Sequence, residues 1–292
     1  MTEPTTAGDL IDEAVQRLKR SPAIEHWPSD RERWDAEQVM SFVLGLDDEA
    51  PYLDEPIDGR RRRRFRELVR RRAGGEPLAQ IFGYTRFCGL KLTVTPGIFV
   101  PRQSTEFMVD QALRRLRGRQ RPVAVDLATG GGPVALAVAH ALRRAEVHGT
   151  DVSEEAVGVA RRNARTLRLA NVSFRRGDLY APLPRRLAGV VDVVTIHPPY
   201  VPRSDVETLP LEIRGFEPEH TLTDYSDHGL GIAERAAVDG RAWLRPGGWI
   251  LMEVSPDRAR AVRALVVRAG YRDVRSTIGP PQVTRVVVGR AP

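Results

Sequence analysis

The sequence has little cysteine, little lysine and no long apolar run. Cys88 is the only cysteine among 292 residues, which excludes an intrachain disulfide and any metal site built from several thiolates. We expect its thiol to be a buried structural group. No stretch approaches the roughly 20 apolar residues of a membrane span, and residues 1–8 are polar, unlike a signal peptide. The sequence therefore predicts a cytoplasmic protein without a membrane segment, preceded by a disordered tail over residues 1–8.

Basic residues are abundant, but lysine occurs only at Lys19 and Lys91. The net charge of +7 is thus carried by arginine, and an arginine bias can reflect genome composition as well as binding. The richest stretch, Arg60 to Arg72, contains nine arginines. Such a patch favours a contact with RNA phosphates or with an acidic protein surface. The alternative is a solvated helix face around an apolar stripe.

The first part of the chain has the pattern of a small helical domain. Apolar residues recur there at the spacing of amphipathic helices, with Asp9 as the expected N-cap of the first helix and Gly74 after the end of the third. The helices are expected at residues 9–20, 35–46 and 57–73. This pattern predicts a helical domain over residues 9–75.

A β-hairpin is expected to follow. Residues 79–95 alternate apolar and polar positions and are interrupted by Gly83 and Gly89, which is typical of two short strands joined by a turn. We expect residues 76–96 to link the helical domain to a larger domain over residues 97–292.

Strands and helices alternate from Pro122 onward. This alternation predicts an α/β fold with a mostly parallel, doubly wound sheet. The expected strands are residues 123–127, 146–151, 172–175, 190–196, 249–254 and 284–288, and the expected helices are residues 103–116, 133–143, 153–169 and 258–269.

The segment from Ile196 to Tyr200 ends one of these strands with the residues His-Pro-Pro-Tyr. Consecutive prolines fix φ and lack N–H donors, so the strand must stop at His197. Ligands of open α/β sheets bind beyond the carboxyl ends of the strands. A polar His197 backed by the ring of Tyr200 is therefore well placed for chemistry, although an ordinary proline turn has the same pattern.

A glycine-rich turn, Asp126 to Gly132, separates the first strand of this sheet from its helix. Glycine permits a tight turn and a close approach of the backbone to a ligand, and the following helix presents free N–H groups. The turn alone fits a plain connection, a dinucleotide site or a nucleoside site. The G-x-G-x-x-G dinucleotide fingerprint is absent.

Two acidic residues follow the next two strands. Asp151 stands where a carboxylate can accept both hydroxyls of a ribose, and Asp178 stands where it can accept a hydrogen bond from an adenine amine. Either residue alone would more often be a loop or capping residue. Together with the glycine turn and the strand end at His197, they favour an adenosine-containing cofactor without a pyrophosphate.

These motifs carry a family resemblance. The segment Asp126 to Gly132 resembles a diverged S-adenosylmethionine (SAM) loop, D-x-G-x-G-x-G, and His-Pro-Pro-Tyr resembles the N-P-P-Y motif of amino-methyltransferases. Over nearly its whole length the chain resembles the HemK/PrmC family of peptide release factor glutamine-N5 methyltransferases, in a diverged, actinobacterial-type form. Further resembling segments are Trp34 to Glu37, Val43 to Gly45, Gly75 to Leu78, Phe99 to Arg102 with Thr105 and Glu106, Phe216 to Pro218 and Pro246 to Gly248.

The resemblance implies a seven-stranded, Rossmann-like class I methyltransferase sheet, SAM as cofactor and a helical domain that docks a release factor. It also implies that the Gly130 to Gly132 turn holds the methionine part of SAM, Asp151 its ribose, and Asp178 or Leu179 its adenine. The implied cofactor-binding residues are Asp126, Ala128, Thr129, Gly130, Gly132, Asp151, Val152, Asp178 and Leu179; the catalytic residues are His197, Pro198 and Tyr200; and the substrate-binding residues are Phe99, Arg102, Thr105 and Pro199.

The chain departs from the family at the residue that should contact the substrate. Family members use the asparagine of N-P-P-Y, with the following proline carbonyl, to hold an amide –NH₂. Here His197 replaces that asparagine, Ala128 replaces the first glycine of the loop, and Gln103-Ser104 replaces a proline-acid pair. A neutral imidazole can accept one N–H and can also take a proton. A base helps an amine or a hydroxyl much more than an amide.

Several functions therefore stay open. The leading one is methylation of a nitrogen in the manner of the release-factor enzymes. The alternatives are a small-molecule O- or N-methyltransferase that uses His197 as a base, and a catalytically impaired protein that holds RNA or a translation factor. Methylation of a nucleic-acid base is less expected.

Two further sets of residues are expected to stay outside the chemistry. His220, Asp224 and His228 have the spacing of metal ligands on a helix, but the surrounding sequence predicts a loop, so no metal site is expected. Glu253, near the end of a predicted strand, is expected to be a structural or rim residue.

Overall fold

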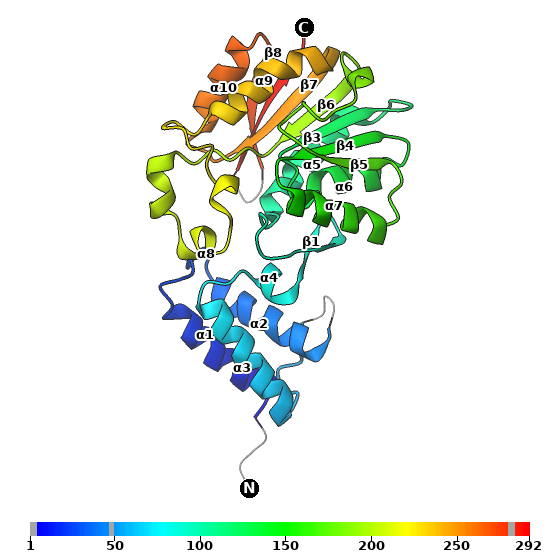
Figure 1. The fold of residues 1–292 in the computed structure, drawn as a ribbon. Coiled ribbons are helices and arrows are strands. Elements are labelled where there is room, and N and C mark those ends of the chain that lie inside the picture. Colours follow the sequence, from blue (N-terminus) through cyan, green and yellow to red (C-terminus); the bar gives the residue numbers. More distant parts are fainter. Residues whose placement is uncertain (1–4, 47–49, 280–283) are drawn as a thin grey trace. The chain divides into compact units, whose positions relative to one another are not determined.

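The computed structural model describes residues 5–46, 50–279 and 284–292, and the chain forms two compact units (Figure 1). The first, here the helical unit, comprises Met1–Gly83 and Glu207–Glu217; the second, here the sheet unit, comprises Tyr84–Val206 and Pro218–Pro292. This division differs from the predicted boundary at residue 75. The helical unit also includes a short segment from much later in the chain, which the sequence did not indicate.

The helical unit is built on amphipathic helices that enclose one apolar core, which includes Leu10, Met40, Phe65 and Leu68. Its elements are α1 (Ala7–Lys19), α2 (Arg31–Leu44), α3 (Gly59–Ala73), α4 (Leu78–Phe82) and, in the late segment, α8 (Leu211–Arg214). The helix α4 stands where the hairpin linker was predicted to begin, so that part of the prediction was wrong. Pro77 and Gly83 bound a single helical turn there.

The first helix begins earlier than predicted. Thr6, and not Asp9, is the N-cap of α1: its hydroxyl accepts a hydrogen bond from the Asp9 amide at 3.2 Å, and the Asp9 carboxylate accepts one from the Thr6 amide at 2.9 Å. This reciprocal pair is a capping box. Residues 7 and 8 thus belong to a helix, which differs from the predicted tail over residues 1–8; residues 1–4 lie outside the described residues.

A buried arginine organises the helical unit. The side chain of Arg72 is 2% exposed, and its Nε donates to Asp35 at 2.5 Å while a terminal nitrogen donates to Glu212 at 2.8 Å. Arg31 also binds both oxygens of Glu212, at 2.8 and 2.7 Å. Because isolated buried charges are costly, these groups depend on one another. The network fastens the segment 207–217 to α2 and α3.

The sheet unit begins with the predicted β-hairpin, formed by β1 (Tyr84–Phe87) and β2 (Leu90–Thr93). Cys88 lies in the turn with a φ of 48°, and its amide donates to Glu106 at 2.6 Å. Burial raises the pKa of its thiol to about 12. The thiol is free, but Cys88 is half-buried and not fully buried as predicted.

The predicted doubly wound sheet is confirmed, and it has seven strands in the order β5-β4-β3-β6-β7-β9-β8. The neighbouring pairs from β5 to β7 are parallel, and β9 runs antiparallel to β7 and β8. The strands are β3 (Val123–Leu127), β4 (Glu146–Asp151), β5 (Val172–Arg176), β6 (Val191–Ile196), β7 (Leu244–Val254), β8 (Arg272–Ile278) and β9 (Arg285–Arg290).

Helices cover both faces of this sheet (Figure 1). Val193 packs in the core with α5, α6 and α7, whereas its neighbour Val194 packs in the core with α9 and α10. Adjacent strand residues point to opposite faces, and both faces are buried, which explains the continuous apolar runs of the inner strands. The helices are α5 (Glu106–Leu116), α6 (Pro133–Ala141), α7 (Glu154–Thr166), α9 (Gly231–Trp243) and α10 (Ala259–Arg268), with short 3₁₀ turns at Gln103–Thr105, Arg185–Leu187, Arg203–Thr208 and Glu219–Thr221.

Two elements of the sheet unit, β8 and α9, were not predicted from the sequence. The strand β8 lies at the edge of the sheet and is exposed along most of its length, so it lacks an apolar pattern. The helix α9 contains glycine and several alanines and has a weak pattern for the opposite reason, because small residues let it pack closely on the sheet. Within the described ranges, no helix has the length and apolar character needed to span a bilayer.

The buried arginine generates a prediction about stability. Replacing Arg72 by alanine leaves the carboxylates of Asp35 and Glu212 buried without their partner, and we expect the free energy of unfolding to fall by about 3–5 kcal/mol. Urea unfolding of the full chain, followed by circular dichroism, measures this. The matched control is Arg66→Ala, which removes an exposed pair with Glu13 at 2.7 Å and should change stability by about 0.5 kcal/mol or less. Equal losses in the two variants would contradict the assignment.

Candidate active site

The predicted site residues meet at one edge of the sheet. Strands β3 and β6 are parallel neighbours, with Leu127 opposite Ile196, and β4 flanks β3 on the other side with Thr150 opposite Leu127. The glycine turn, the Asp151 loop and His197 therefore all follow the carboxyl ends of adjacent strands. The chain order reverses between β3 and β6, and open α/β sheets bind ligands at such a point.

Asp126 lies beneath the glycine turn. It is 4% exposed, and its carboxylate accepts hydrogen bonds from the hydroxyls of Thr129 at 2.5 Å and Thr195 at 2.7 Å. Burial raises the pKa of this carboxyl to about 6, against the effect of the two hydroxyls. The carboxylate thus joins the turn to β6 and holds Thr129 from below.

The turn itself passes through left-handed backbone conformations at Ala128, Gly130 and Gly132, with φ values of 49°, 55° and 86°. Gly132 is the N-cap of α6, and a Cβ there would lie 2.8 Å from the ring of Phe174. At Gly130 a Cβ would meet no atom within 4 Å. Packing below the turn thus requires glycine at position 132, whereas the space beside Gly130 is open.

Asp151 and the glycine turn are directly bonded. One carboxylate oxygen of Asp151 accepts from the Gly130 amide at 2.8 Å, and the other accepts from the Ser153 amide at 2.9 Å. Burial raises the pKa of Asp151, and these hydrogen bonds oppose the shift. Each carboxylate oxygen can accept a second hydrogen bond, so the pair retains the capacity to bind a diol. Beside it, Val152 exposes 55% of its surface, a large fraction for an apolar side chain.

The Asp178 loop lies next to Asp151, since the Gly177 amide donates to the Asp151 carbonyl at 2.8 Å. The carboxylate of Asp178 is exposed and forms an ion pair with Arg235 of α9. Leu179 is buried and has a φ of 44°. Of this pair, the exposed Asp178 is the side chain that a ligand can reach.

The imidazole of His197 is held between two aromatic rings. Its centroid lies 5.3 Å from that of Phe99, edge to face, and 5.8 Å from that of Tyr200, nearly parallel. The side chain is 19% exposed. Burial lowers the pKa of His197; the carboxylate of Glu253 opposes this shift, and the guanidinium of Arg102 adds to it. The ring is therefore neutral near pH 7 and fixed in its plane.

Glu253, which was expected to be a structural or rim residue, lies beside His197. It lies on β7, next to β6, and is 1% exposed. One carboxylate oxygen accepts from the Thr284 hydroxyl at 3.0 Å and the Ser104 hydroxyl at 3.4 Å. The other, Oε2, has no hydrogen-bond partner among the described residues and lies 3.9 Å from Nδ1 of His197. The sequence signal for this position was an acidic residue at the carboxyl end of β7, the strand beside β6.

The remaining predicted residues of this part of the site are Arg102, Pro198, Pro199 and Thr105. Arg102 stacks on the ring of Phe99, with its guanidinium carbon 4.8 Å from the ring centroid. Pro198 and Pro199 are buried and end β6 as predicted. Thr105 is buried too, and its hydroxyl has no hydrogen-bond partner within the described part of the chain.

Comparison with known proteins identifies the family. A family model described as the PrmC N-terminal domain matches residues 9–83, and one described as a methyltransferase domain matches residues 121–235. The release factor glutamine methyltransferase of Geobacter sulfurreducens is 36% identical, over 88% of this chain and 89% of that protein. That of Bordetella pertussis is 40% identical, over 91% and 92%. The chain belongs to the release factor glutamine methyltransferase family.

The predicted fold and cofactor of this family member are also confirmed. The T. thermophilus 16S rRNA N2 G1207 methyltransferase (RsmC), solved in complex with AdoMet and guanosine, matches with a TM-score of 0.52 and 18% identity, over 72% of this chain and 50% of that one. This likeness shows the class I methyltransferase fold. The protein is a SAM-dependent methyltransferase.

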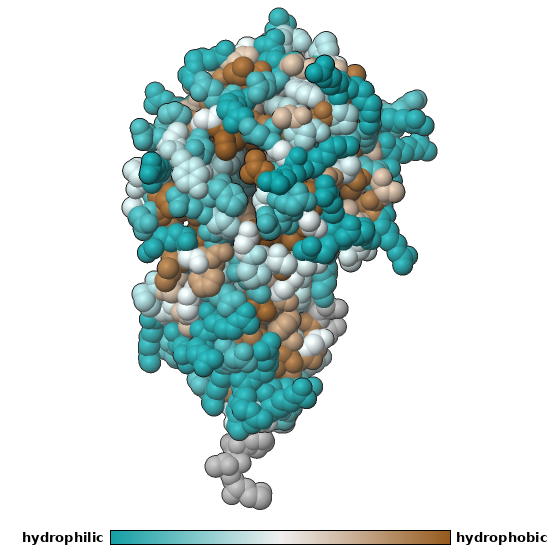
Figure 2. Space-filling model, in the orientation of Figure 1, coloured by the Kyte–Doolittle hydropathy of each residue, from teal (hydrophilic) through white to brown (hydrophobic). Residues whose placement is uncertain are grey.

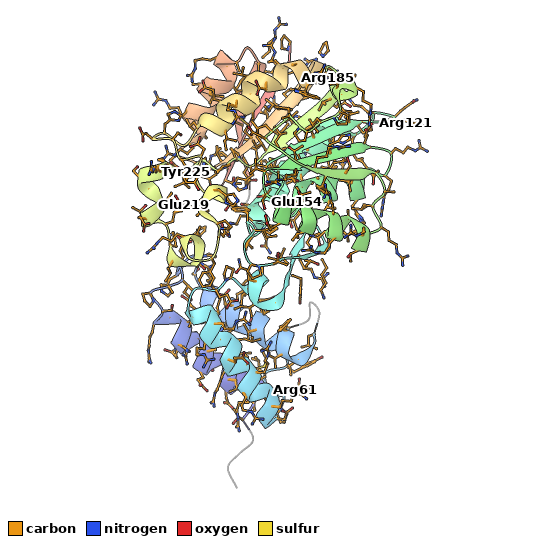
Figure 3. All side chains as sticks on the ribbon, viewed as in Figure 1. Arg61, Arg121, Glu154, Arg185, Glu219 and Tyr225 are labelled. Atoms are coloured by element: carbon orange, nitrogen blue, oxygen red, sulfur yellow. The ribbon has the colours of Figure 1, made fainter. Side chains whose placement is uncertain are left out.

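In this methyltransferase, residues 218–230, which precede α9 in the sheet unit, pack on the histidine turn, the residues from His197 to Pro202. The Val201 amide donates to the Leu222 carbonyl at 3.0 Å, and a Cβ at Gly229 would collide with the Tyr200 carbonyl. Figure 3 shows Glu219 and Tyr225 on this segment. The close approach requires glycine at position 229, where φ is 66°.

The same segment explains the residues with metal-ligand spacing. Asp224 accepts hydrogen bonds from the amides of Gly231 at 2.5 Å and Ile232 at 3.2 Å, so it caps the first turn of α9. The Nδ1 atom of His228 accepts from the Leu230 amide at 3.0 Å. In the residues that the structure covers, no group of three or more histidine, cysteine or acidic side chains is placed to hold a metal ion.

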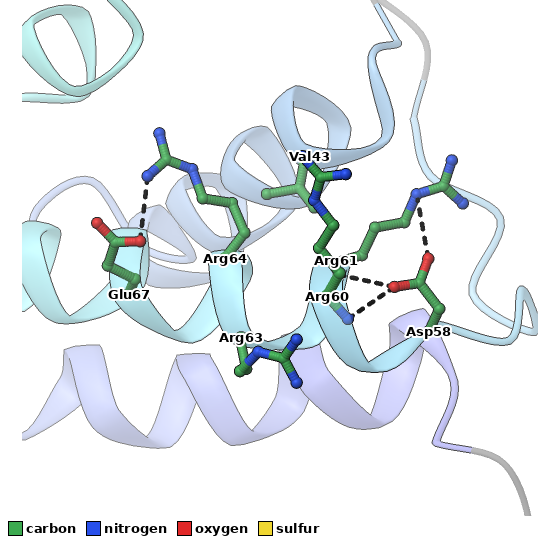
Figure 4. Close-up of a pocket in the computed structure, with 7 residues that line it drawn as sticks. All are labelled: Val43, Asp58, Arg60, Arg61, Arg63, Arg64 and Glu67. Carbon is green, nitrogen blue, oxygen red and sulfur yellow. Dashed lines mark hydrogen bonds and ion pairs between the residues drawn. The ribbon is translucent and has the colours of Figure 1, made fainter.

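The arginine-rich helix α3 lines a shallow pocket in the helical unit of the methyltransferase (Figure 4). Figure 2 shows that hydrophilic residues cover much of the visible face of this unit. Several arginines of α3 pair with carboxylates, among them Arg64 with Glu67 at 3.1 Å and Arg71 with Glu76 at 2.5 Å. Much of the positive charge is thus neutralised within the unit. Contact of this helix with RNA stays a prediction.

The glycine turn generates a matched pair of variants. We expect Gly132→Ala to destabilise the fold by about 2 kcal/mol or more, because the left-handed backbone and the collision with Phe174 both oppose a Cβ. In Gly130→Ala the new Cβ meets open space. Only the left-handed backbone conformation opposes it, so the free energy of unfolding should fall by about 1 kcal/mol. Thermal denaturation without SAM measures both. If Gly130→Ala proved as damaging as Gly132→Ala, packing under the turn would not be the reason for the glycine.

Proposed function

We propose that this methyltransferase transfers the methyl group of SAM to the side-chain amide nitrogen of a glutamine in a peptide release factor. The observation that carries the proposal is the extent of the match: relatives of that name align over about nine-tenths of both chains. The alignment includes the helical unit as well as the sheet unit. A methyltransferase recruited to an unrelated acceptor would need to keep only the sheet unit.

The residues beside the glycine turn fit SAM. The Asp151 carboxylate has spare acceptor capacity for the two ribose hydroxyls, Val152 offers an exposed apolar surface for the adenine ring, and Asp178 can accept from the adenine amine. The open space beside Gly130 could take the methionine part of SAM. The Gly130 and Gly132 amides already donate to Asp151 and to the Thr129 carbonyl, so they shape the turn. Asp126, Ala128, Thr129 and Leu179 would support this binding surface from beneath or beside it.

The acceptor amide would be held at His197. When bound, SAM would supply an electrophilic methyl group, whose bond to sulfur would break as the carbon–nitrogen bond forms, and the acceptor nitrogen would then release one of its two protons. The imidazole and the Pro198 carbonyl would hold the amide –NH₂, while Tyr200 and Phe99 fix the ring and exclude water. Because an amide nitrogen is a weak nucleophile, catalysis would come from position and desolvation. Arg102, Thr105 and Pro199 would border the substrate, and the helical unit would dock the release factor.

One observation favours a second candidate. His197 is neutral near pH 7 and can take a proton, a capacity that an asparagine lacks and that would help a hydroxyl or an amine acceptor. This supports O- or N-methylation of a small molecule by the same site. The acceptor assay below separates the two candidates.

Labelled SAM and purified release factor test the acceptor. We expect label to enter the release factor, with mass spectrometry locating the methyl group on one glutamine side chain. A release factor with that glutamine replaced by alanine serves as the control and should stay unlabelled. Label that appears only in the small-molecule fraction of a cell extract would reject the release factor as acceptor and support the second candidate.

Calorimetry with SAM tests the cofactor site. Asp151→Ala removes a carboxylate that would bind two hydroxyls, and we expect the dissociation constant for SAM to rise roughly 10- to 100-fold, as for loss of a charge-assisted hydrogen bond. The control is Glu154→Ala, an equal charge change at an exposed position of α7 (Figure 3), which should bind SAM nearly as the parent does. Unchanged affinity in Asp151→Ala would place the ribose elsewhere.

A further inference from the structure

The carboxylate of Glu253 is incompletely satisfied in a way that points at His197. Its side chain is 2% exposed, and hydroxyl donors reach only Oε1. The other oxygen, Oε2, is buried without a hydrogen bond and faces Nδ1 of His197 at 3.9 Å. A buried acceptor without a donor is costly, and the imidazole N–H is the group within nearest reach. At 3.9 Å the two atoms lie beyond hydrogen-bond distance, but an N–H and a carboxylate oxygen still attract each other electrostatically in a buried place.

We propose that Glu253 is a positioning residue that fixes the tautomer of His197. An Nδ1–H that faces Glu253 directs its partial positive charge toward Oε2 and leaves Nε2 as the unprotonated nitrogen, since a neutral imidazole carries one proton. The two nitrogens lie on opposite sides of the ring, so Nε2 points away from Glu253. The opposite tautomer would set two lone pairs, on Nδ1 and Oε2, against each other in a buried place. Glu253 thereby determines which edge of the ring accepts a hydrogen bond.

The tautomer matters because of what His197 replaces. If the chain acts on a glutamine amide, as proposed above, the residue in this position must accept an N–H from the substrate. An asparagine carbonyl does this without help, whereas a histidine does it only with an unprotonated nitrogen facing the substrate. The Glu253 carboxylate supplies that condition. It makes the histidine serve as an acceptor, with Nε2 in the role of a carbonyl oxygen.

The other groups around the ring do not compete for Nδ1. Phe99 and Tyr200 contact the ring as aromatic neighbours, and burial raises the pKa of the Tyr200 hydroxyl, which keeps it neutral. Arg102 is a cation and cannot accept a proton. The hydroxyls of Thr284 and Ser104 donate to Oε1 of Glu253, the oxygen that does not face His197. Among the charged groups that act on His197, Glu253 alone favours the imidazolium, and burial and Arg102 oppose it.

Nitrogen-15 NMR of the full chain, labelled at histidine, tests the tautomer without any methyl acceptor. The protein has six histidines, and the difference from His197→Asn assigns the signal. We expect the Nδ1–H form in the parent and a mixture, or the Nε2–H form, in Glu253→Gln, whose amide can donate to Nδ1. The control Glu106→Gln removes a carboxylate bound to the Cys88 amide of the same unit and should leave the signal unchanged. An Nε2–H form in the parent would overturn the proposal.

The pH dependence of methyl transfer gives a second readout. Protonated His197 has no acceptor, so activity should fall as the pH drops through the pKa of His197. In Glu253→Gln this acid limb should move to lower pH, because a charge that favours the imidazolium is gone, and kcat should fall roughly 10-fold. In a His197→Asn background, the loss of activity at low pH should be absent. There Glu253→Gln should reduce kcat several-fold less than it does in the parent. A loss as large in both backgrounds would show that Glu253 is only structural. If no acceptor is methylated, the NMR result still decides the tautomer, so failure of the proposed function is distinguishable.

Discussion

The pairing of β3 with β6 is the constraint on which the site depends. These strands are far apart in the sequence, yet their parallel alignment sets Leu127 opposite Ile196, and the residues after each strand come to one edge. Asp126 reinforces the pairing from within, since its carboxylate binds Thr129 of the turn and Thr195 of β6. The glycine turn and the histidine turn are thus connected by hydrogen bonds as well as by the sheet. A shift of one strand would separate them.

Much of the sheet was predictable because its inner strands are buried on both faces. Runs such as residues 123–127 and 190–196 have few other interpretations, and the motifs at their ends supplied the candidate site. The missed elements lack such a pattern: β8 is an exposed edge strand, and α9 packs through alanine and glycine. Glu253 could not be assigned for a different reason. Its role depends on β7 lying beside β6 and on the unpaired oxygen facing His197, neither of which is a local property.

The substitution of histidine for asparagine changes the demands on its surroundings. An amide side chain presents donor and acceptor atoms that are fixed by covalent structure. An imidazole can exchange its donor and acceptor, so its surroundings must select one arrangement. The rings of Phe99 and Tyr200 fix the plane of the imidazole. The buried carboxylate of Glu253 is suited to determine which of its two nitrogens carries the proton. A chain with histidine in this position therefore depends on a neighbour that is less important for asparagine.

The segment 207–217 has a consequence for how the protein is made. Arg72 and Arg31 belong to the first part of the chain, but their partner Glu212 is more than a hundred residues later. During synthesis the helices α1 to α3 leave the ribosome long before Glu212 does, and the guanidinium of Arg72 then has the carboxylate of Asp35 as a partner but not that of Glu212. The helical unit reaches its final set of ion pairs only after strands β3 to β6 have been translated. It is therefore not a module that a gene rearrangement could move as one uninterrupted piece.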